Sequence, residues 1–386
     1  MIRCLHLADL HLGWVPDNQN FSSDKVSIRR KERDSVFETA VNWAIDPKNK
    51  IDFLIIAGDL FETHTPKPTL VEYVLSQLRQ LENAGIRTIT VPGNHDEITY
   101  HNSVYREYGS EGKWPGILVQ NSMPDLVDCF SVNGIPVFIY SLAYTGGLTK
   151  INELTNFPRK ESPGLHIGIF HGSLDWEGVS DRSLPLKSEL LQNARYDYIA
   201  LGHIHKHMEV KIGSGLAVYP GLIDSKGFND IGCGYMTVAQ FQPRGNGKSS
   251  GGFKVGLEFI DISVRDYITL EVDISAKGNF EEVVSECKMR TKPGSVAKVI
   301  LKGVPGFKVE KDRLEAFLED HFLLLEIEDE STLLGSDDIM KLSEESTIRG
   351  CFVRRLLDRL EKANSHREKE VLELALRKGL AAFERW

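Results

Sequence analysis

Short apolar runs, each followed directly by polar residues, recur along the first part of the chain. The runs at 2–8, 52–57 and 86–91 are long enough for buried strands and too short for most helices. Between them, residues 29–46 and 66–84 place apolar side chains at helical spacing. This alternation of strand and helix predicts an α/β protein with a parallel, layered core.

Shorter apolar segments continue the pattern as far as residue 262, with one expected helix at 184–193 among them. We expect the last four strands to form an antiparallel half of the domain. The Gly-, Ser- and Lys-rich stretch 243–252 predicts a mobile hairpin tip. The strands are expected at 117–119, 127–132, 136–141, 165–170, 196–201, 208–212, 216–219, 234–241 and 253–262.

The pattern changes near residue 265. Strand and helix signals then alternate as far as residue 327, which predicts a compact βαβαβ unit that caps the first domain. Residues 328–343 are acidic and predict a linker. We therefore divide the chain into a first domain at 1–265, an α/β cap at 266–330, and a linker with a helical tail at 331–386.

The tail predicts a helical hairpin with one apolar stripe on each helix. Ser365 to Glu368 form a capping box that begins the second helix. Two helices can bury only part of these stripes against each other. The remaining apolar surface either packs on the cap or serves as a docking site for a helical partner.

Composition narrows the class of protein. The chain has 386 residues, a hydrophobic share of 41% and no apolar run that would span a membrane. It begins with a strand pattern and not a signal peptide, and its five scattered cysteines form no CxxC pair, so we expect a cytoplasmic protein. The net charge of -9 argues against a simple polyanion-binding module, although bound cations would reverse the local field.

Metal-binding residue types follow five of the expected strands. Residues two apart on an extended segment share a face, and the carboxyl ends of parallel strands meet at one edge of a sheet. Carboxylate, amide and imidazole groups without thiolates suit a pair of Mn, Fe, Zn or Mg ions. The candidate residues are Asp9, His11, Asp59, Asn94, His95, His171, His203 and His205.

These residues stand in strings that resemble a known family. Asp9-Leu10-His11, Gly58-Asp59, Gly93 to Asp96, His171-Gly172 and Gly202 to His205 are similar to the motifs of the calcineurin-like metallophosphoesterases. The wider strings around them resemble the branch that contains the SbcD-type and YhaO-type DNA double-strand-break repair nucleases. The resemblance implies a four-layer α/β/β/α core for residues 1–240.

The resemblance also implies a site. Asp59 would bridge two metal ions, Mn being the activating ion in the family, and His95 would be a catalytic residue that binds no metal. By motif, Asp9, His11, Asp59 and His205 would hold one ion, and Asp59, Asn94, His171 and His203 would hold the other.

The family implies substrates and partners as well. Its members act as DNA exonucleases and endonucleases with an SbcC-like, coiled-coil ABC-type ATPase, for which the helical tail is the natural docking place. They commonly dimerise through the catalytic domain. Arg30, Arg33 and Lys206 are candidates for contact with DNA phosphates; a solvated helix end is the alternative for the two arginines.

One position departs from the branch. Many of its nucleases have a catalytic His directly after Gly-Asp-Leu-Phe, where this chain has Glu62. His64 follows two residues later and is either an accessory catalytic residue or a solvated loop residue.

Two other functions remain open. The first is a phosphodiesterase or phosphatase that acts on a non-DNA phosphoester, although Phe61-Glu62 does not fit the Asp-Arg that Ser/Thr phosphatases place after their Gly-Asp motif. The second is a non-catalytic scaffold that recruits the ATPase, although a scaffold would not need all the candidate ligands.

Overall fold

The computed structural model divides into two compact units, Met1–Val264 and Arg265–Trp386. Most of the expected hairpin tip at 243–252 lies outside the described residues. The structure describes residues 1–16, 21–109, 112–146, 154, 156–159, 161–176, 183–230, 233–244, 252–305, 307, 309–331 and 336–383.

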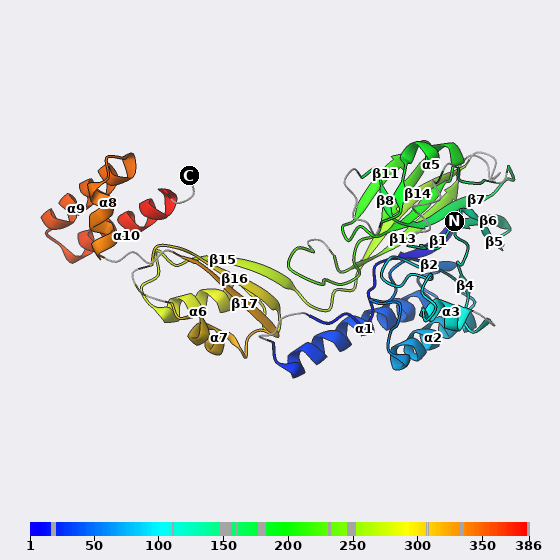
Figure 1. Ribbon diagram of the computed structural model, residues 1–386, viewed down its shortest axis with the longest axis horizontal. Coiled ribbons are helices and arrows are strands. Elements are labelled where there is room, and N and C mark those ends of the chain that lie inside the picture. The colour runs from blue at the N-terminus through cyan, green and yellow to red at the C-terminus, as the bar shows by residue number, and fades with distance from the viewer. Residues whose placement is uncertain are drawn as a thin grey trace. The chain divides into compact units, whose positions relative to one another are not determined.

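One six-stranded sheet of the first unit has the order β14-β13-β1-β2-β3-β4 (Figure 1). Its first four strands in the chain are parallel; β13 pairs antiparallel with β1, and β14 pairs antiparallel with β13 at the edge. The strands are β1 (Ile2–Leu7), β2 (Phe53–Ala57), β3 (Arg87–Val91), β4 (Ile117–Leu118), β13 (Tyr235–Pro243) and β14 (Phe253–Asp261).

Helices α1 (Ser23–Ile45) and α2 (Pro68–Asn83) cover this sheet, with the short α3 (Val104–Gly109) nearby (Figure 1). The apolar faces of α1 and α2 share one buried cluster with β1, β2 and β3. Helix α1 begins six residues before the expected Arg29, because Ser22 caps it and accepts a hydrogen bond from the Lys25 N–H.

The second sheet has the order β11-β12-β10-β7-β6-β5. Its four middle strands are parallel, and β5 and β11 run antiparallel to them. The last four strands of the unit form two antiparallel pairs, as expected, but the pairs belong to different sheets and do not make up one antiparallel half. Two of the strands assigned to that half, β13 and β14, belong to the first sheet. The strands are β5 (Asp125–Val132), β6 (Ile135–Ser141), β7 (Leu165–His171), β10 (Tyr198–Gly202), β11 (Met208–Ile212) and β12 (Gly215–Tyr219).

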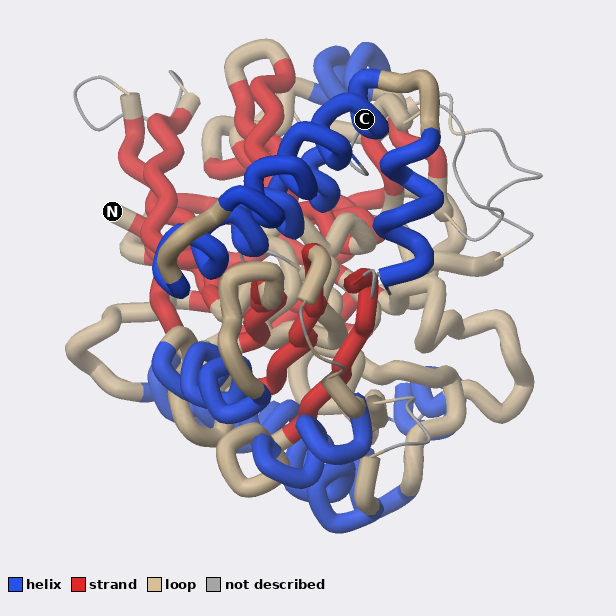
Figure 2. The backbone as a smooth tube through the Cα atoms, turned by 90° about the vertical axis from the view of Figure 1, so that its left-hand side faces the viewer, coloured by secondary structure: helices blue, strands red, loops and turns tan. Residues whose placement is uncertain are grey.

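The two sheets pack face to face. Strand β2 contacts β7 and β10, and Leu5 of β1 lies in the same buried cluster as Ile169 of β7. Helix α5 (Ser188–Ala194) covers the other side of the second sheet, after a small pair formed by β8 (Ser173–Leu174) and β9 (Pro185–Leu186). The expected four-layer α/β/β/α core is confirmed. Figure 2 shows the strands of the whole chain in red and its helices in blue.

The second unit contains the expected βαβαβ element. Strands β15 (Tyr267–Asp273), β16 (Val296–Gly303) and β17 (Leu324–Ser331) form a parallel sheet in that order. Helices α6 (Phe280–Met289) and α7 (Lys311–Leu318) bury one face of the sheet. The opposite face carries charged side chains.

Three helices follow: α8 (Ser336–Glu344), α9 (Ile348–Lys362) and α10 (His366–Phe383). The linker expected at 328–343 is wrong, because β17 continues to Ser331 and α8 begins at Ser336. The expected hairpin is present as α9 and α10, and the Ser365 Oγ accepts from the Glu368 N–H as a cap. None of the helices that the structure describes has the length and apolar character required to cross a membrane.

Candidate metal centre

The carboxyl ends of β1, β2, β3, β7 and β10 bring the expected ligands to one place. In one group, ligand atoms of Asp9, His11 and His205 all lie within 4.8 Å of one another. The same holds in a second group for Asp9, Asp59 and His171, and in a third for His11, Asp59 and His95. Residues as far apart in sequence as Asp9 and His205 therefore meet in one buried site, as the parallel order of the strands requires.

The first side of the site is built around His11. Its Nε2 lies 3.2 Å from the His205 Nε2 and 3.8 Å from the Asp59 Oδ2. Two imidazole nitrogens that face each other can share one proton, whereas a cation would accept a lone pair from each. The three side chains therefore fit a divalent ion on this side.

The second side is built around Asn94. Its Oδ1 lies 2.9 Å from the His171 Nε2 and 2.8 Å from the His203 Nδ1. The Asp59 Oδ2 is 3.3 Å from the same His171 nitrogen, so one carboxylate oxygen faces both sides of the site. This set of oxygen and imidazole donors fits a second divalent ion, with Asp59 shared between the two.

Four of the candidate ligand residues have left-handed backbones. Their φ angles are 52° at Asp9, 48° at His11, 50° at Asp59 and 100° at His203. The backbone bonds from Asp9 N–H to Gly58 O and from His11 N–H to Asp59 O, at 3.1 and 2.9 Å, hold the first two loops together. Residues other than glycine adopt such conformations at a cost, and they persist where the surrounding structure imposes them, often at functional sites.

Glycine permits the loops to approach each other. A Cβ at Gly58, whose φ is +95°, would lie 2.1 Å from the His171 Nδ1. A Cβ at Gly93 would lie 2.2 Å from the Asp59 Oδ1. Any larger residue at these two positions would displace a ligand.

Asp96 fixes the loop that carries Asn94 and His95. It is fully buried; its Oδ1 accepts from the Gly93 N–H at 2.7 Å, and its Oδ2 accepts from the Phe61 N–H at 3.0 Å and the Tyr105 hydroxyl at 2.7 Å. Asp96 was not among the expected site residues. Its place in the Gly93 to Asp96 string was the available signal.

His95 lies at the solvent-accessible edge of the site. Its backbone N–H donates to the Asp59 Oδ1 at 2.8 Å, and its ring packs edge-on against the His11 ring with 4.7 Å between centroids. The side chain is 35% exposed, in contrast to the fully buried His11. His95 can therefore reach a substrate that approaches the metal ligands from solvent.

Burial sets the protonation of the ligands. It raises the pKa of Asp9 to about 7 and lowers the pKa of His11 and of His203 to about 4. Burial would also raise the pKa of Asp59, but the neighbouring His171 and His11 lower it. Both His11 and His203 are thus neutral near pH 7, the form in which imidazole binds a metal.

Glu62 supports His11 from behind. Its Oε2 lies 2.8 Å from the His11 Nδ1 and 2.7 Å from the Lys226 Nζ. Burial opposes ionisation, but these two neighbours lower the pKa of Glu62 to about 2. An ionised carboxylate behind a metal-binding histidine orients the ring and increases its basicity.

His64 lies elsewhere. Its ring stacks on Tyr100 with 4.0 Å between centroids, and it belongs to none of the candidate metal-binding groups found among the described residues. At the position of the family histidine, Glu62 contacts the site instead.

The family model of the calcineurin-like phosphoesterases matches residues 2–207, the part of the chain that supplies all the candidate ligands described above. The chain belongs to this family.

Curated relatives of this calcineurin-like phosphoesterase match beyond the family domain. The metallophosphoesterase YhaO of Bacillus subtilis is 25% identical, with 82% of this chain and 76% of that protein covered. The DNA double-strand break repair protein Mre11 of Methanopyrus kandleri is 26% identical, with 82% and 68% covered. Mre11 of Methanocaldococcus jannaschii is 24% identical, with 99% and 95% covered, so the similarity extends through the second unit.

Two arginines of α1 brace the phosphoesterase site from inside. Arg33 donates to the carbonyl oxygens of Leu10, at 3.0 Å, and Asp224, while Arg29 donates to the Asp224 carboxylate. The expectation that Arg33 contacts DNA is wrong, because its side chain is buried and engaged within the protein. It instead holds the carbonyl between two ligands, Asp9 and His11. Arg30 is half-buried and Lys206 exposed, so both remain accessible to a substrate.

Proposed function

We propose that this protein is a DNA nuclease of the SbcD type, which hydrolyses phosphodiester bonds with two divalent metal ions. We expect both ions to be Mn. The observation that carries the proposal is the Asp59 Oδ2, which faces both groups of ligands, with the accessible His95 beside it. The named double-strand break repair proteins among the relatives, and the length over which they match, support DNA as the substrate.

In this proposal Asp9, His11, Asp59 and His205 hold one ion, and Asp59, Asn94, His171 and His203 hold the other. When bound, such a pair neutralises phosphate oxygens and lowers the pKa of a water molecule. Glu62 keeps His11 oriented, and Arg33 and Asp96 keep the ligand loops in place.

His95 acts on the substrate itself. Its backbone N–H donates to Asp59, and its ring Nδ1 lies 3.2 Å from the Glu62 carbonyl oxygen. Held in this way, the ring would present its Nε2 to the leaving sugar oxygen and give it a proton. General acid catalysis of this kind contributes about 10²–10⁴-fold to the rate. Arg30 and Lys206 would contact backbone phosphates on either side of the scissile one.

The second unit would recruit an SbcC-like, coiled-coil ATPase through its last helices. Ile348 on α9 is 81% exposed and Val371 on α10 is 60% exposed, so part of each apolar stripe faces solvent. A hollow on α9, lined by Ile348, Phe352 and Arg355 among others, offers apolar and cationic contacts to a partner helix.

The test is Mn-dependent release of nucleotides from linear duplex and single-stranded DNA, beside the small diester bis-p-nitrophenyl phosphate. We expect the wild type to cleave DNA, and His95→Ala to retain Mn and DNA binding but lose cleavage by about 10²–10⁴-fold. Cleavage of the small diester alone, unchanged after addition of a co-purified ATPase, would contradict the nuclease and favour a phosphodiesterase with another substrate.

A further inference from the structure

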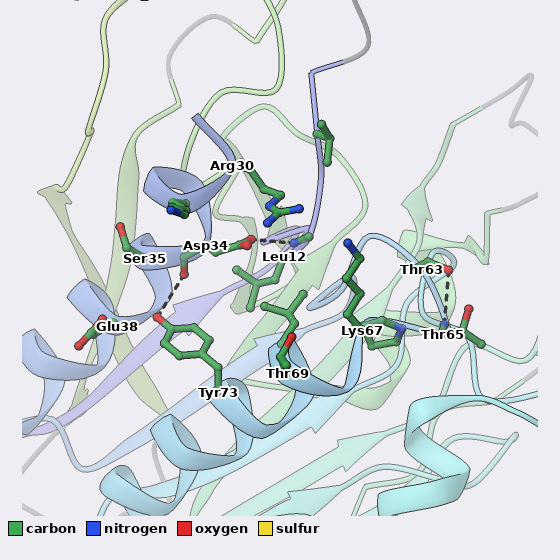
Figure 3. A pocket seen from close by; sticks show the side chains of 15 residues that line it. Leu12, Arg30, Asp34, Ser35, Glu38, Thr63, Thr65, Lys67, Thr69 and Tyr73 are labelled. Carbon is green, nitrogen blue, oxygen red and sulfur yellow. Dashed lines mark hydrogen bonds between the residues drawn. The ribbon is translucent and has the colours of Figure 1, made fainter. Parts of the chain in front are cut away.

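A cavity of about 510 Å³ adjoins the candidate metal centre (Figure 3). Leu12 and Gly13, which line it, directly follow the ligand His11, and Thr63, also in its wall, directly follows Glu62. Its volume is in the range of about 300–1,000 Å³ that is typical of small-molecule sites. The cavity belongs to the same loops as the metal ligands but contains none of them.

Cationic side chains enter the cavity from two sides. Arg30 extends from α1, and Lys67 extends from the residue before α2 on the facing wall (Figure 3). Within the part of the chain that the structure describes, neither Arg30, Lys31 nor Lys67 forms a hydrogen bond or an ion pair that would occupy it. These cations are therefore available to an anionic ligand.

Two acidic residues line the cavity. One accepts a hydrogen bond from the protein, and the other is exposed to solvent. Asp34 accepts a hydrogen bond from the Gly13 N–H at 2.7 Å, and the Tyr73 hydroxyl donates to its carbonyl oxygen. Glu38 is exposed one turn further along α1. The carboxylate of Asp34 therefore holds the loop after His11 in place, and burial raises its pKa while the charges of Arg30 and Arg33 act to lower it.

The start of α2 adds further donors. Its N-cap residue, Lys67, makes no side-chain capping bond, and Pro68 at the first position has no N–H. Thr69 lines the cavity at the positive end of the helix dipole, where backbone N–H groups favour an anion. Together with Arg30 and Lys67, this end of the helix favours a phosphate group.

The rest of the lining is apolar or aromatic. Leu70 and Tyr73 of α2 and Leu12 form a floor with the stems of the longer side chains. Such a surface suits the flat face of a nucleobase, whereas inorganic phosphate would leave it uncovered.

We propose that this cavity binds one unpaired nucleotide of the strand being cut, with its phosphate between Arg30 and Lys67 and its base on the Leu70 and Tyr73 floor. The inference rests on the proposed nuclease function and extends it to the choice of substrate. A cavity of this size accepts a single nucleotide and not a base pair, so a strand end must open before it can enter.

The test measures binding of dAMP to the full-length protein by calorimetry in EDTA, so that no metal contributes. We expect Arg30→Gln and Lys67→Gln each to weaken dAMP binding about 5–10-fold, the loss expected for a charge-assisted hydrogen bond at a half-exposed site. Arg79→Gln removes an equal charge from an exposed position on α2 that does not line the cavity and should leave binding unchanged. Circular dichroism of each variant controls for folding.

Two ligand controls separate a nucleotide site from a phosphate site. We expect deoxyribose 5-phosphate and inorganic phosphate to bind at least about tenfold more weakly than dAMP, since they leave the apolar floor uncovered. Equal binding of the three ligands would overturn the nucleotide assignment, and so would dAMP binding that is absent or unaffected by both variants. Because these readouts need no cleavage, dAMP binding without DNA hydrolysis would contradict the nuclease alone, and DNA hydrolysis without dAMP binding would contradict the cavity alone.

Discussion

Parallel strands carry charged residues in both units of the molecule. The charges are buried in the first unit and exposed to solvent in the second. In the first unit Asp9 and Asp59 are buried at strand ends beside histidines. In the second unit, Lys298 and Lys302 stand on the open face of the sheet and pair with Glu328 and Glu271 across the strands, each at 2.6 Å. The exposed charges satisfy each other, whereas the buried set has two carboxylates beside one imidazole, His171, whose pKa their charges raise to about 9 against the effect of burial, and it fits added cations.

The difference in burial distinguishes the charges that matter for function from those that do not. Partly exposed ion pairs are worth about 0–1 kcal/mol and can be exchanged with little effect. Buried carboxylates without a matching cation are costly, so their presence at a single edge favours a bound metal.

The largest effect is expected at Asp59. Asp59→Asn keeps an oxygen to accept from the His95 N–H but removes the charge shared by the two sides of the site. We expect phosphodiester cleavage to fall by more than about 10³-fold, or about 4 kcal/mol in activation free energy. The bound Mn per chain, measured by elemental analysis, should fall with it; full Mn occupancy in the variant would refute the bridging role.

Arg33 should matter next, through stability. Arg33→Met leaves the carbonyl oxygens of Leu10 and Asp224 without their guanidinium donor, at about 1–3 kcal/mol each. We expect the free energy of unfolding in urea to fall by about 2–4 kcal/mol, with weaker Mn binding. Arg30→Met, on the same helix but half-buried, should change the free energy of unfolding by less than about 0.5 kcal/mol; equal losses in the two variants would remove the bracing role from Arg33.

Glu62→Gln should act on the metal and leave the fold intact. The substitution removes the carboxylate charge behind His11, and we expect Mn affinity to fall about 10–100-fold. His64→Ala is the matched control in the same loop and should leave Mn affinity unchanged. A loss of cleavage in His64→Ala at full Mn occupancy would instead give His64 the accessory catalytic role.

The smallest effect is expected on the charged face of the second unit. Lys302→Gln removes a cation that pairs with Glu271 at 2.6 Å and lies 3.7 Å from Glu330. We expect the free energy of unfolding to change by less than about 1 kcal/mol, and cleavage of bis-p-nitrophenyl phosphate to be unchanged. A fall of several kcal/mol in the free energy of unfolding would contradict the view that the exposed charges contribute little.

The sequence was most informative where a short apolar strand leads directly into a ligand. Asp59 follows β2 and His203 follows β10 with no intervening loop, so local pattern alone placed them at one edge of the fold. The same local reading found the βαβαβ unit, since each of its elements buries one regular face.

Contacts between residues that are far apart in the sequence could not be predicted from the local pattern of apolar and polar residues. Strand β13 joins β1 although more than 200 residues separate them, and nothing in either segment specifies this partner. Arg33 looked like a surface cation because its acceptor, the carbonyl of Asp224, lies 191 residues away. Helix α8 looked like an acidic linker, because few of its residues, such as Ile339 and Leu342, pack against the other helices.

The left-handed backbones of the ligand residues have a consequence for the history of such a chain. At a position where φ is positive, glycine would relieve strain of about 1 kcal/mol or more, so folding stability alone would favour glycine at Asp9, His11, Asp59 and His203. A descendant that no longer needed its metals would be free to drift toward glycine and would become more stable as it did. Four residues with strained backbones gathered at one site are what is expected of a protein in which some stability is given up for a functional site.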